Sequence, residues 1–416
     1  MSQQQTPLQK NTTSQESTQA TAGVLERSVD RLYSLIANEE DARVCRDIPA
    51  EACHVVPRNF FLILAANVLT KLGDLLISPK TVLAWLMSAI GAPALVAWLV
   101  PIRESGSMVP QMMIAAWVRR KPVRKWFWTI GSFGQAVSVA AMAACVWFLE
   151  GYTAGGGIIA ALIVFSLSRG FCSVAMKDVQ GKCIPKTRRG RLSGLAATIG
   201  GTATVILTVL LFWERGNPTL AFYSLLLLLA AVLWIIAGLL FAGVEEHDGE
   251  TGGGGNALTE AFHSLSLLRD DAPFRNFVIT RALLLCSALA SPYFVVLAQK
   301  ESDTGLMLGV FLLASSLASS VSASFWGWMA DFFVLSIAHA GVRLGRKTYL
   351  VDMAGGNKRT DYTAVSNTVI GFLLLATGGL TALLSLISNA AVIVVLGLMG
   401  LAGTFSAIRL KEVTDD

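Results

Sequence analysis

The sequence predicts an all-α membrane protein whose helices form two bundles. The chain is 54% hydrophobic and only 15% charged, whereas soluble domains carry about 25% charged residues. Apolar runs of about 20 residues, the length of a membrane span, recur from residue 59 to residue 410, and the mean hydropathy is +0.59. One long polar break, 244–275, divides these runs into two groups.

The N-terminal 58 residues are predicted to be a polar cytoplasmic tail. Thirteen of the first twenty residues are Gln, Ser or Thr, a composition typical of disorder. This start has no apolar core of the kind that a signal peptide needs. Residues 24–36 place apolar side chains at helical intervals, which predicts a short amphipathic helix on the membrane or on the bundle.

The spans follow in two groups. The first group lies in 59–243 and has six predicted helices: 59–89, 94–117, 126–149, 157–179, 193–213 and 219–243. The second group lies in 276–410, before a short tail at 411–416, and has apolar runs at 276–298, 306–329, 332–353, 363–386 and 389–408. Proline removes a backbone donor and interrupts helices, so we expect breaks at Pro79, Pro101, Pro110 and Pro292.

The loops alternate in charge. Basic residues crowd the second and fourth loops, at 119–125 and 182–191, whereas 150–156, 214–218 and 299–305 carry one basic residue or none. Because Lys and Arg concentrate on the cytoplasmic side of membrane proteins, the N-terminus and the basic loops are predicted to be cytoplasmic. We expect a multi-pass protein of a bacterial inner (plasma) membrane.

The polar break at 244–275 is predicted to be a cytoplasmic linker between the two bundles. It opens with four acidic residues within 245–250 and contains four consecutive glycines at 252–255, a composition typical of flexible linkers. Residues 257–268 carry one apolar face and predict an interfacial helix. Two groups of spans joined in this way form a layout common among secondary transporters.

Three features of the sequence resemble the major facilitator superfamily. They are Leu72-Gly73-Asp74 inside the first span, Gly327-Trp328-Met329-Ala330-Asp331 after the eighth, and the paired basic loops. In that family a G-x-x-x-D motif followed by basic residues recurs in two loops. Here the loop at 119–125 has the basic residues without the matching Gly and Asp, and the later loop has Gly327 and Asp331 without the basic residues. The resemblance implies a two-bundle transporter, in which Asp74 and Arg169 correspond to coupling and binding positions.

The second group of spans is one helix short of the family's twelve. Residues 332–357, only 26 positions, stand where the first group has two spans. A weak sequence repeat between 189–199 and 358–370 is the basis for aligning the second group of spans with the first. We therefore expect eleven helices derived from twelve by a deletion, or a run at 332–353 that does not cross fully.

Charged residues within the spans point to function, since each costs about 2.5–3.5 kcal/mol at mid-membrane on insertion scales and such residues usually face a bundle interior or a wet cavity. The carboxylates able to bind and release a proton are Asp74 and Glu104. The predicted solute-binding residues are Lys71, Arg103, Gln111, Arg169 and Arg343. The charges predicted to gate the cytoplasmic end are Lys177, Asp178, Asp331, Arg346, Lys347 and Asp352.

These charges have a second interpretation. Lys71 with Asp74, and Arg103 with Glu104, could simply neutralise each other and hold helices together. Long basic side chains near span ends, including Arg281, could snorkel to the interface.

The favoured function is a permease, a secondary transporter of a small polar, anionic or zwitterionic solute, working by alternating access with proton coupling. The alternative is a non-transporting membrane receptor or scaffold, or an inactive truncated transporter. The sequence has no enzyme motif, so no catalytic residue, metal ligand or cofactor is predicted. The expected partners are the lipid bilayer, the solute and protons, without nucleic acid or an obligate protein partner.

Overall fold

The structure, a computed structural model, describes Tyr33 and residues 54–212, 219–249, 251, 267–301, 308–314, 317 and 358–408. Within these ranges every regular element is a helix. The run predicted at 332–353, most of 306–329 and nearly all of the helix predicted at 257–268 lie outside the described residues. The all-α prediction is confirmed for the described chain.

The first half contains the helices predicted between 59 and 243, some of them divided. They are α3 (Val56–Leu76), α4 (Val82–Ala89), the 3-10 turn η1 (Pro93–Leu95), α5 (Val96–Met108), α6 (Gln111–Arg119), α7 (Lys125–Phe148), α8 (Gly151–Cys183), α9 (Lys186–Phe212) and α10 (Leu220–Ala242). The helix breaks expected at Pro79 and Pro110 are present. Pro79 lies between α3 and α4, and Pro110 lies between α5 and α6.

Two details of the first half differ from the sequence prediction. Pro101 does not break a helix but lies inside α5. Its ring is accommodated by α17 (Lys358–Ser385), where a Cβ added at Gly378 would stand 2.3 Å from the ring. Most of the predicted loop 150–156 is helical, because α8 begins at Gly151.

The second half contains fewer described elements. They are α12 (Leu267–Asp270), α13 (Ala272–Ser287), the 3-10 turn η2 (Ala288–Ala290), α14 (Ser291–Glu301), α17 and α18 (Asn389–Ile408). Pro292 lies in the first turn of α14, where a missing N–H costs little, so the break predicted there is confirmed.

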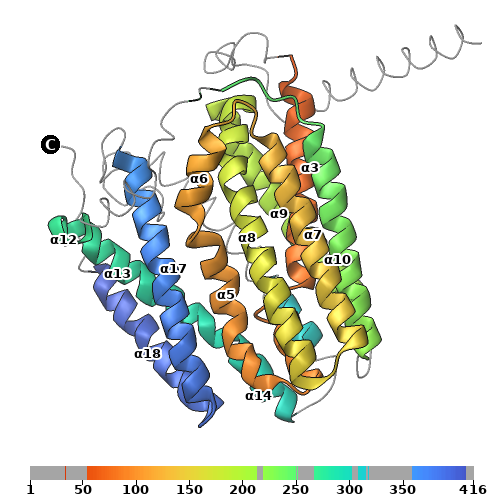
Figure 1. Cartoon of the computed structure of the whole chain (residues 1–416), viewed down its shortest axis with the longest axis vertical. Coiled ribbons are helices and arrows are strands. Elements are labelled where there is room, and N and C mark those ends of the chain that lie inside the picture. Colours follow the sequence, from red (N-terminus) through yellow and green to blue (C-terminus); the bar gives the residue numbers. More distant parts are fainter. Residues whose placement is uncertain are drawn as a thin grey trace, which may run out of the picture.

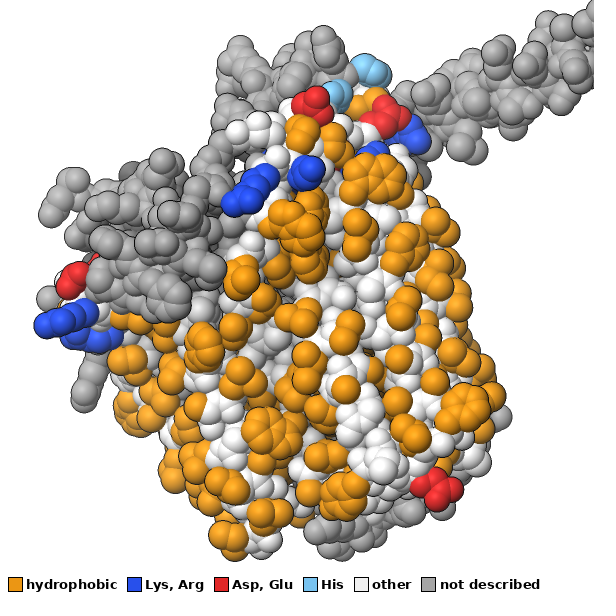
Figure 2. Space-filling model, viewed as in Figure 1, with side chains coloured by type: hydrophobic (Ala, Val, Ile, Leu, Met, Phe, Trp, Pro, Cys, Tyr) orange, Lys and Arg blue, Asp and Glu red, His pale blue; other side chains and the backbone are white. Residues whose placement is uncertain are grey.

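The long helices of the first half lie side by side, and the C-termini of α6, α8 and α10 lie at one end of the molecule (Figure 1). We name this the basic end. It carries the α6–α7 loop, the C-terminus of α8 and the C-terminus of α10. In the view of Figure 2, apolar side chains cover the flank and charged ones cluster mainly at this end. Seven helices of the described chain are long and apolar enough to cross a membrane, and α18 is a further apolar helix.

The two halves pack against each other mainly through α5 and α17, and also through α4 and α14. The buried Ser105 hydroxyl of α5 donates a 2.8 Å hydrogen bond to the carbonyl oxygen of Gly371 on α17. Val295 and Val296 of α14 belong to the same hydrophobic cluster as Leu83 of α4. The halves are therefore joined both by apolar packing and by a side-chain-to-backbone hydrogen bond.

The tail meets the first bundle at Tyr33. Its ring stands edge-on to Phe60 of α3, with 5.4 Å between the ring centroids. Burial raises the pKa of the Tyr33 hydroxyl, and the positive charge of Arg188 opposes that shift. At this residue the tail is packed on the bundle, one of the two placements that the sequence predicts for its amphipathic segment.

Candidate functional site

Three charged residues from three helices meet inside the first bundle. Arg169 of α8 donates two hydrogen bonds to Asp74 of α3, one to each carboxylate oxygen, both at 2.7 Å. Arg103 of α5 donates a third, also at 2.7 Å, to Oδ1 of the same carboxylate. The side chains of Arg103, Asp74 and Arg169 are 11%, 24% and 30% exposed. We name these three residues the Asp74 cluster.

Small residues let the three helices approach closely enough to form this cluster. A Cβ added at Gly106 of α5 would stand 2.5 Å from the Cβ of Ser166 on α8. A Cβ added at Gly170, next to Arg169, would stand 2.8 Å from Ile114 of α6. Gly73, next to Asp74, lies against the Trp234 ring of α10, with 3.0 Å to an added Cβ. A larger residue at any of these glycines would have to displace Ser166, Ile114 or Trp234.

The cluster holds two cations against one anion in a partly buried place. Removing one partner of a buried ion pair costs about 3–5 kcal/mol, because the other charge loses its compensation. Bidentate guanidinium–carboxylate bonding is also among the stronger hydrogen-bond geometries. Loss of the Asp74 charge, or an anion competing for Arg169, would therefore change the energy of this junction substantially.

Lys71 and Glu104, also predicted for the site, lie close to the cluster residues in sequence but have hydrogen-bond partners outside the cluster. Lys71 Nζ donates to the carbonyl oxygen of Ala197 on α9 at 3.2 Å, and its stem lies over Gly200. Glu104 is half-buried on α5, and its backbone carbonyl accepts a bond from the Ser107 hydroxyl at 2.9 Å. The interpretation that Asp74 is neutralised by Lys71 is therefore wrong, since its partners come from α5 and α8.

Two further polar contacts involve the second half. Gln111, a predicted solute-binding residue on α6, accepts a 2.8 Å hydrogen bond from the amide of Asn367 on α17. Arg281 of α13 donates to the hydroxyl of Ser366 on α17 at 2.9 Å. Arg281 therefore bonds to a neighbouring helix in the bundle, rather than only reaching toward the membrane surface.

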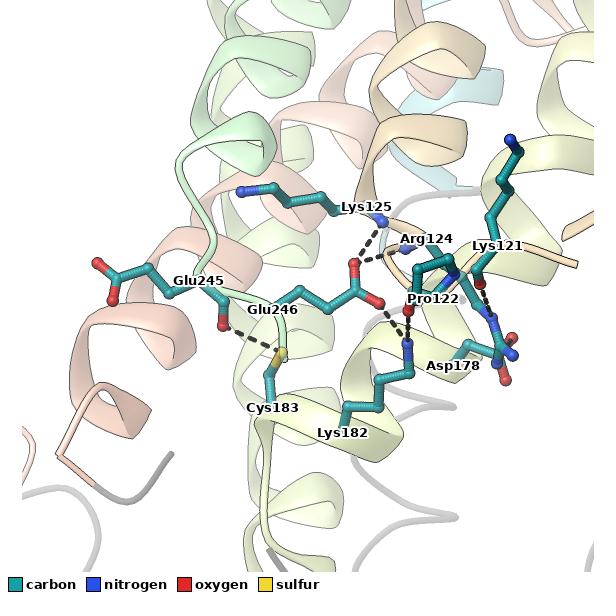
Figure 3. A network of polar contacts seen from close by, with 9 residues as sticks. All are labelled: Lys121, Pro122, Arg124, Lys125, Asp178, Lys182, Cys183, Glu245 and Glu246. Carbon is teal, nitrogen blue, oxygen red and sulfur yellow. Dashed lines mark hydrogen bonds and ion pairs between the residues drawn. The ribbon is translucent and has the colours of Figure 1, made fainter. Parts of the chain in front are cut away.

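A second group of charged residues forms a network of polar contacts at the basic end of the first bundle (Figure 3). Glu246 follows α10, and its side chain, including the carboxylate, is fully buried. It accepts bonds from the backbone N–H groups of Arg124 and Lys125 at 2.8 and 2.6 Å, and from Lys182 Nζ at 2.7 Å. Because those two N–H groups begin α7, Glu246 caps the positive end of that helix dipole.

The same network reaches the predicted gating residue Asp178 and the start of α3. Arg124 pairs with Asp178 of α8 at 2.8 Å. Asn59 of α3 exchanges two hydrogen bonds with the backbone of Glu245, and Arg58 pairs with the Glu245 carboxylate. We name the residues drawn in Figure 3 the basic-end network. The first residues of the predicted linker, 244–249, are therefore bound to the first bundle.

Some predicted residues stand apart from these contacts, and several important residues were not predicted. Lys177 is exposed on α8, while the other predicted residues, Asp331, Arg343, Arg346, Lys347 and Asp352, lie outside the described residues. The sequence did not single out the neighbours Asn59, Arg124, Phe165, Lys182, Glu246, Ser366 and Asn367. An acidic run placed at the same membrane side as two basic loops was the signal that could have found Glu246.

The comparisons with known proteins concern the arrangement of the helices. No protein-family model and no curated protein matches the chain. Among solved structures, the chain is similar to the xylose transporter XylE from E. coli in a partially occluded inward-open conformation. That likeness has a TM-score of 0.48 and 11% identity, and covers 85% of this chain and 90% of that chain.

It is also similar to a bacterial homologue of the human lysosomal transporter Spinster, in an inward-facing and unoccupied conformation. Here the TM-score is 0.44 and the identity 12%, with 84% of this chain and 82% of that chain covered. The described chain is itself all-α, with seven apolar helices of membrane-spanning length and a charged cluster between α3, α5 and α8.

Proposed function

We propose that this chain is a secondary active transporter that moves a small polar solute across a membrane by alternating access, coupled to protons. The observation that carries the proposal is the Asp74 cluster. Three side chains that bind protons or anions are kept together between the shorter helix α5 and the helices α3 and α8, which are long and apolar enough to cross a membrane, at a site where burial is costly.

Each residue of the cluster has a role in this proposal. Asp74 is the group that takes up and releases the proton. Arg169 binds the negative group of the solute, and Arg103 completes the charge balance. Gln111 and Asn367, bonded across the two halves, belong to the surface along which the halves move relative to each other. The excess of cations over anions supports an anionic or zwitterionic solute.

The proposed topology follows from the charge distribution. The basic end carries most of the Lys and Arg of the loops, so the positive-inside rule assigns it to the cytoplasm. The chain enters α3 and α17 from that end and returns to it at the end of α18 (Figure 1). Both termini then face the cytoplasm, in the plasma membrane of a bacterium.

Proton movement into liposomes tests the proposal with a broad set of solutes. The purified protein is reconstituted with an internal pH dye, and solutes from a panel of carboxylates, amino acids, phosphates and sugars are added outside. We expect at least one solute to drive proton entry, and Asp74→Asn to abolish that entry. Ser366→Ala is the control, because it removes a hydroxyl from the second half without changing any charge.

Two outcomes would contradict the proposal. Equal proton entry by the wild type and Asp74→Asn would remove Asp74 from the coupling step. No proton entry with any panel member, by a protein that is folded in the liposomes, would favour a receptor, a scaffold or an inactive transporter. Deleting residues 1–50 then tests the scaffold, which needs its tail for function.

A further inference from the structure

The residue of the N-terminal tail that the structure describes before residue 54, Tyr33, lies on an apolar surface at the start of α3. Its ring meets Phe60 edge-on, and Phe60 in turn meets the half-buried Phe61 edge-on, with 5.7 Å between those two centroids. Tyr33 also packs against the buried Val56, the first residue of α3. The tail is therefore seated on aromatic and aliphatic side chains of the first bundle.

The start of α9 forms the other side of this seat. Phe60 belongs to one hydrophobic cluster with Leu192 of α9, and Tyr33 packs against that cluster. The positive charge of Arg188, near the start of α9, acts on the Tyr33 hydroxyl. Arg191 follows three positions later, so it shares a helix face with Arg188, and it is exposed. Tyr33 thus lies between an apolar surface on α3 and a basic surface on α9.

The sequence that leads to Tyr33 is complementary to both surfaces. In a helix, residues three, four and seven positions apart share a face. Val29 is four positions before Tyr33, whereas Asp30 and Glu26 are three and seven positions before it. A helix over 24–33 would therefore present an apolar side chain on one side of the Tyr33 ring and two carboxylates on the other. The carboxylates match the charge of the basic start of α9.

The membrane surface is the other placement expected for this segment, and its charge does not favour that placement. Helices that lie on a membrane are rich in Lys and Arg on their polar face, which are attracted to anionic lipids. Residues 24–33 contain two acids and two arginines, Arg27 and Arg31, so they have no net charge. The described contact, at Tyr33, is with protein.

We propose that residues 24–33 form a helix that docks on the first bundle across the starts of α3 and α9. Val29 joins Tyr33 on the apolar start of α3. Glu26 and Asp30 face the basic start of α9, where they pair with its arginines. The partner of this surface is the chain's own tail, and the docking does not depend on the transport function proposed above.

Limited trypsin digestion of the full chain in detergent tests whether the segment is docked. Trypsin cleaves after Lys10, Arg27 and Arg31, and each rate is divided by the rate for the same bond in a synthetic peptide of residues 1–35. We expect the bonds after Arg27 and Arg31 to be cleaved roughly tenfold more slowly than the bond after Lys10, because the helix must detach first. Equal normalised rates would overturn the docking.

Two variants locate the origin of this protection. Tyr33→Ala removes the ring that lies on Phe60, so the bonds after Arg27 and Arg31 should then be cleaved at the normalised rate of the bond after Lys10. Tyr33→Phe keeps the ring and should keep most of the protection. Unchanged protection in Tyr33→Ala would overturn the seat at the start of α3.

Photo-crosslinking in nanodiscs identifies what the segment touches. The photoreactive residue p-benzoylphenylalanine replaces Val29 in one sample and Thr12, outside the segment, in another. Peptide mapping by mass spectrometry should place the crosslinks from position 29 within 56–61 or 188–196, and position 12 should give no crosslink there. Crosslinks from position 29 only to lipid, to another part of the chain or to a second copy would overturn the proposal.

A charge exchange tests the basic side of the surface. Asp30→Lys is expected to lower the yield of the crosslink from position 29 roughly threefold, the size of a surface ion pair. Adding Arg191→Glu should restore the yield. Adding Lys121→Glu instead should not, because Lys121 is an exposed cation of the α6–α7 loop. An unchanged yield in Asp30→Lys, or rescue by both second changes, would overturn the pairing with α9.

Discussion

In both halves of the described chain, the opening helix packs against the two closing helices. In the first half α3 packs against α9 and α10, and in the second half α13 packs against α17 and α18. Each opening helix also directs a cation to the next-to-last helix: Lys71 to Ala197 and Arg281 to Ser366. The weak sequence repeat between 189–199 and 358–370 falls on those same receiving helices, α9 and α17.

The halves differ in their acids. Asp74 lies on α3 and bonds to two arginines, whereas α13 and α18 contain no Asp or Glu. The comparison teaches that a repeated packing plan can bring an acid and two arginines together in one copy, while the matching cation of the other copy bonds to a hydroxyl. In our account the first half binds the proton and the anion, and the second half supplies the surface against which the first half moves.

The largest expected effect is a difference in stability loss between a variant of Asp74 in the first half and a variant of Ser366 in the second half. Asp74→Asn removes the acceptor of two arginines and is expected to lower the free energy of unfolding by about 3 kcal/mol, since a broken buried pair leaves uncompensated charge. Ser366→Ala, which removes one neutral partner of Arg281, is expected to cost about 1 kcal/mol. Thermal unfolding in detergent measures both, and an equal loss would remove the difference between the halves.

A smaller effect is expected at the basic-end network of the first half. Glu246→Gln removes the charge from a carboxylate that accepts three hydrogen bonds and is expected to cost about 2 kcal/mol. Glu245→Gln is the matched control, because that side chain is 48% exposed and pairs with an exposed Arg58. Surface pairs contribute about 0–1 kcal/mol.

Denaturant or thermal unfolding of the two glutamine variants, in one detergent and at one pH, decides between them. A larger loss in Glu245→Gln than in Glu246→Gln would mean that the network is held by its outer pair. The described residues 244–249 would then be attached to the bundle chiefly through Arg58.

The smallest effect tests the surface where the halves meet. Gly378→Ala would place a Cβ 2.3 Å from the Pro101 ring, whereas Gly379→Ala would place one 3.6 Å from Trp98, an ordinary contact. We expect Gly378→Ala to cost about 1–2 kcal/mol through overpacking and to slow proton entry. Gly379→Ala should stabilise slightly or have no effect, because alanine favours helices. Similar thermal midpoints for the two variants would argue against close contact of α5 with α17.

The hydropathy of the sequence predicted most of the described fold, because the spacing of apolar runs does not depend on tertiary neighbours. Helix α7 begins and ends within one residue of its predicted bounds, and Pro79 and Pro110 mark real breaks. Pro101 was predicted wrongly because the glycine that accommodates its ring lies in the other half of the chain. A local rule cannot include such a partner.

The site could be predicted in part. Membrane depth, together with the family resemblance, identified Asp74 and Arg169 as functional candidates. Their direct pairing, across 95 positions of sequence, depends on how α3 and α8 pack. The same is true of Phe165, which looks like any apolar residue of a span until α5 brings Arg103 over its ring. Charge identity is local information, whereas charge pairing is set by tertiary structure.

The most direct test of alternating access measures distances at both ends of the molecule. Spin labels are introduced as unnatural amino acids, which leaves the native cysteines in place. One pair replaces the exposed residues Lys121 and Asp270, and the other replaces the exposed Glu150 and Ile387 at the opposite end. Pulsed electron spin resonance then compares each pair in the wild type, in Asp74→Asn and in Ser366→Ala.

Our account predicts that Asp74→Asn shifts both distributions from their wild-type positions, with one end widening while the other narrows. Ser366→Ala should leave both distributions at their wild-type positions. Distances that stay fixed at both ends, or that widen together, would contradict a transporter in which Asp74 controls the movement of the two halves.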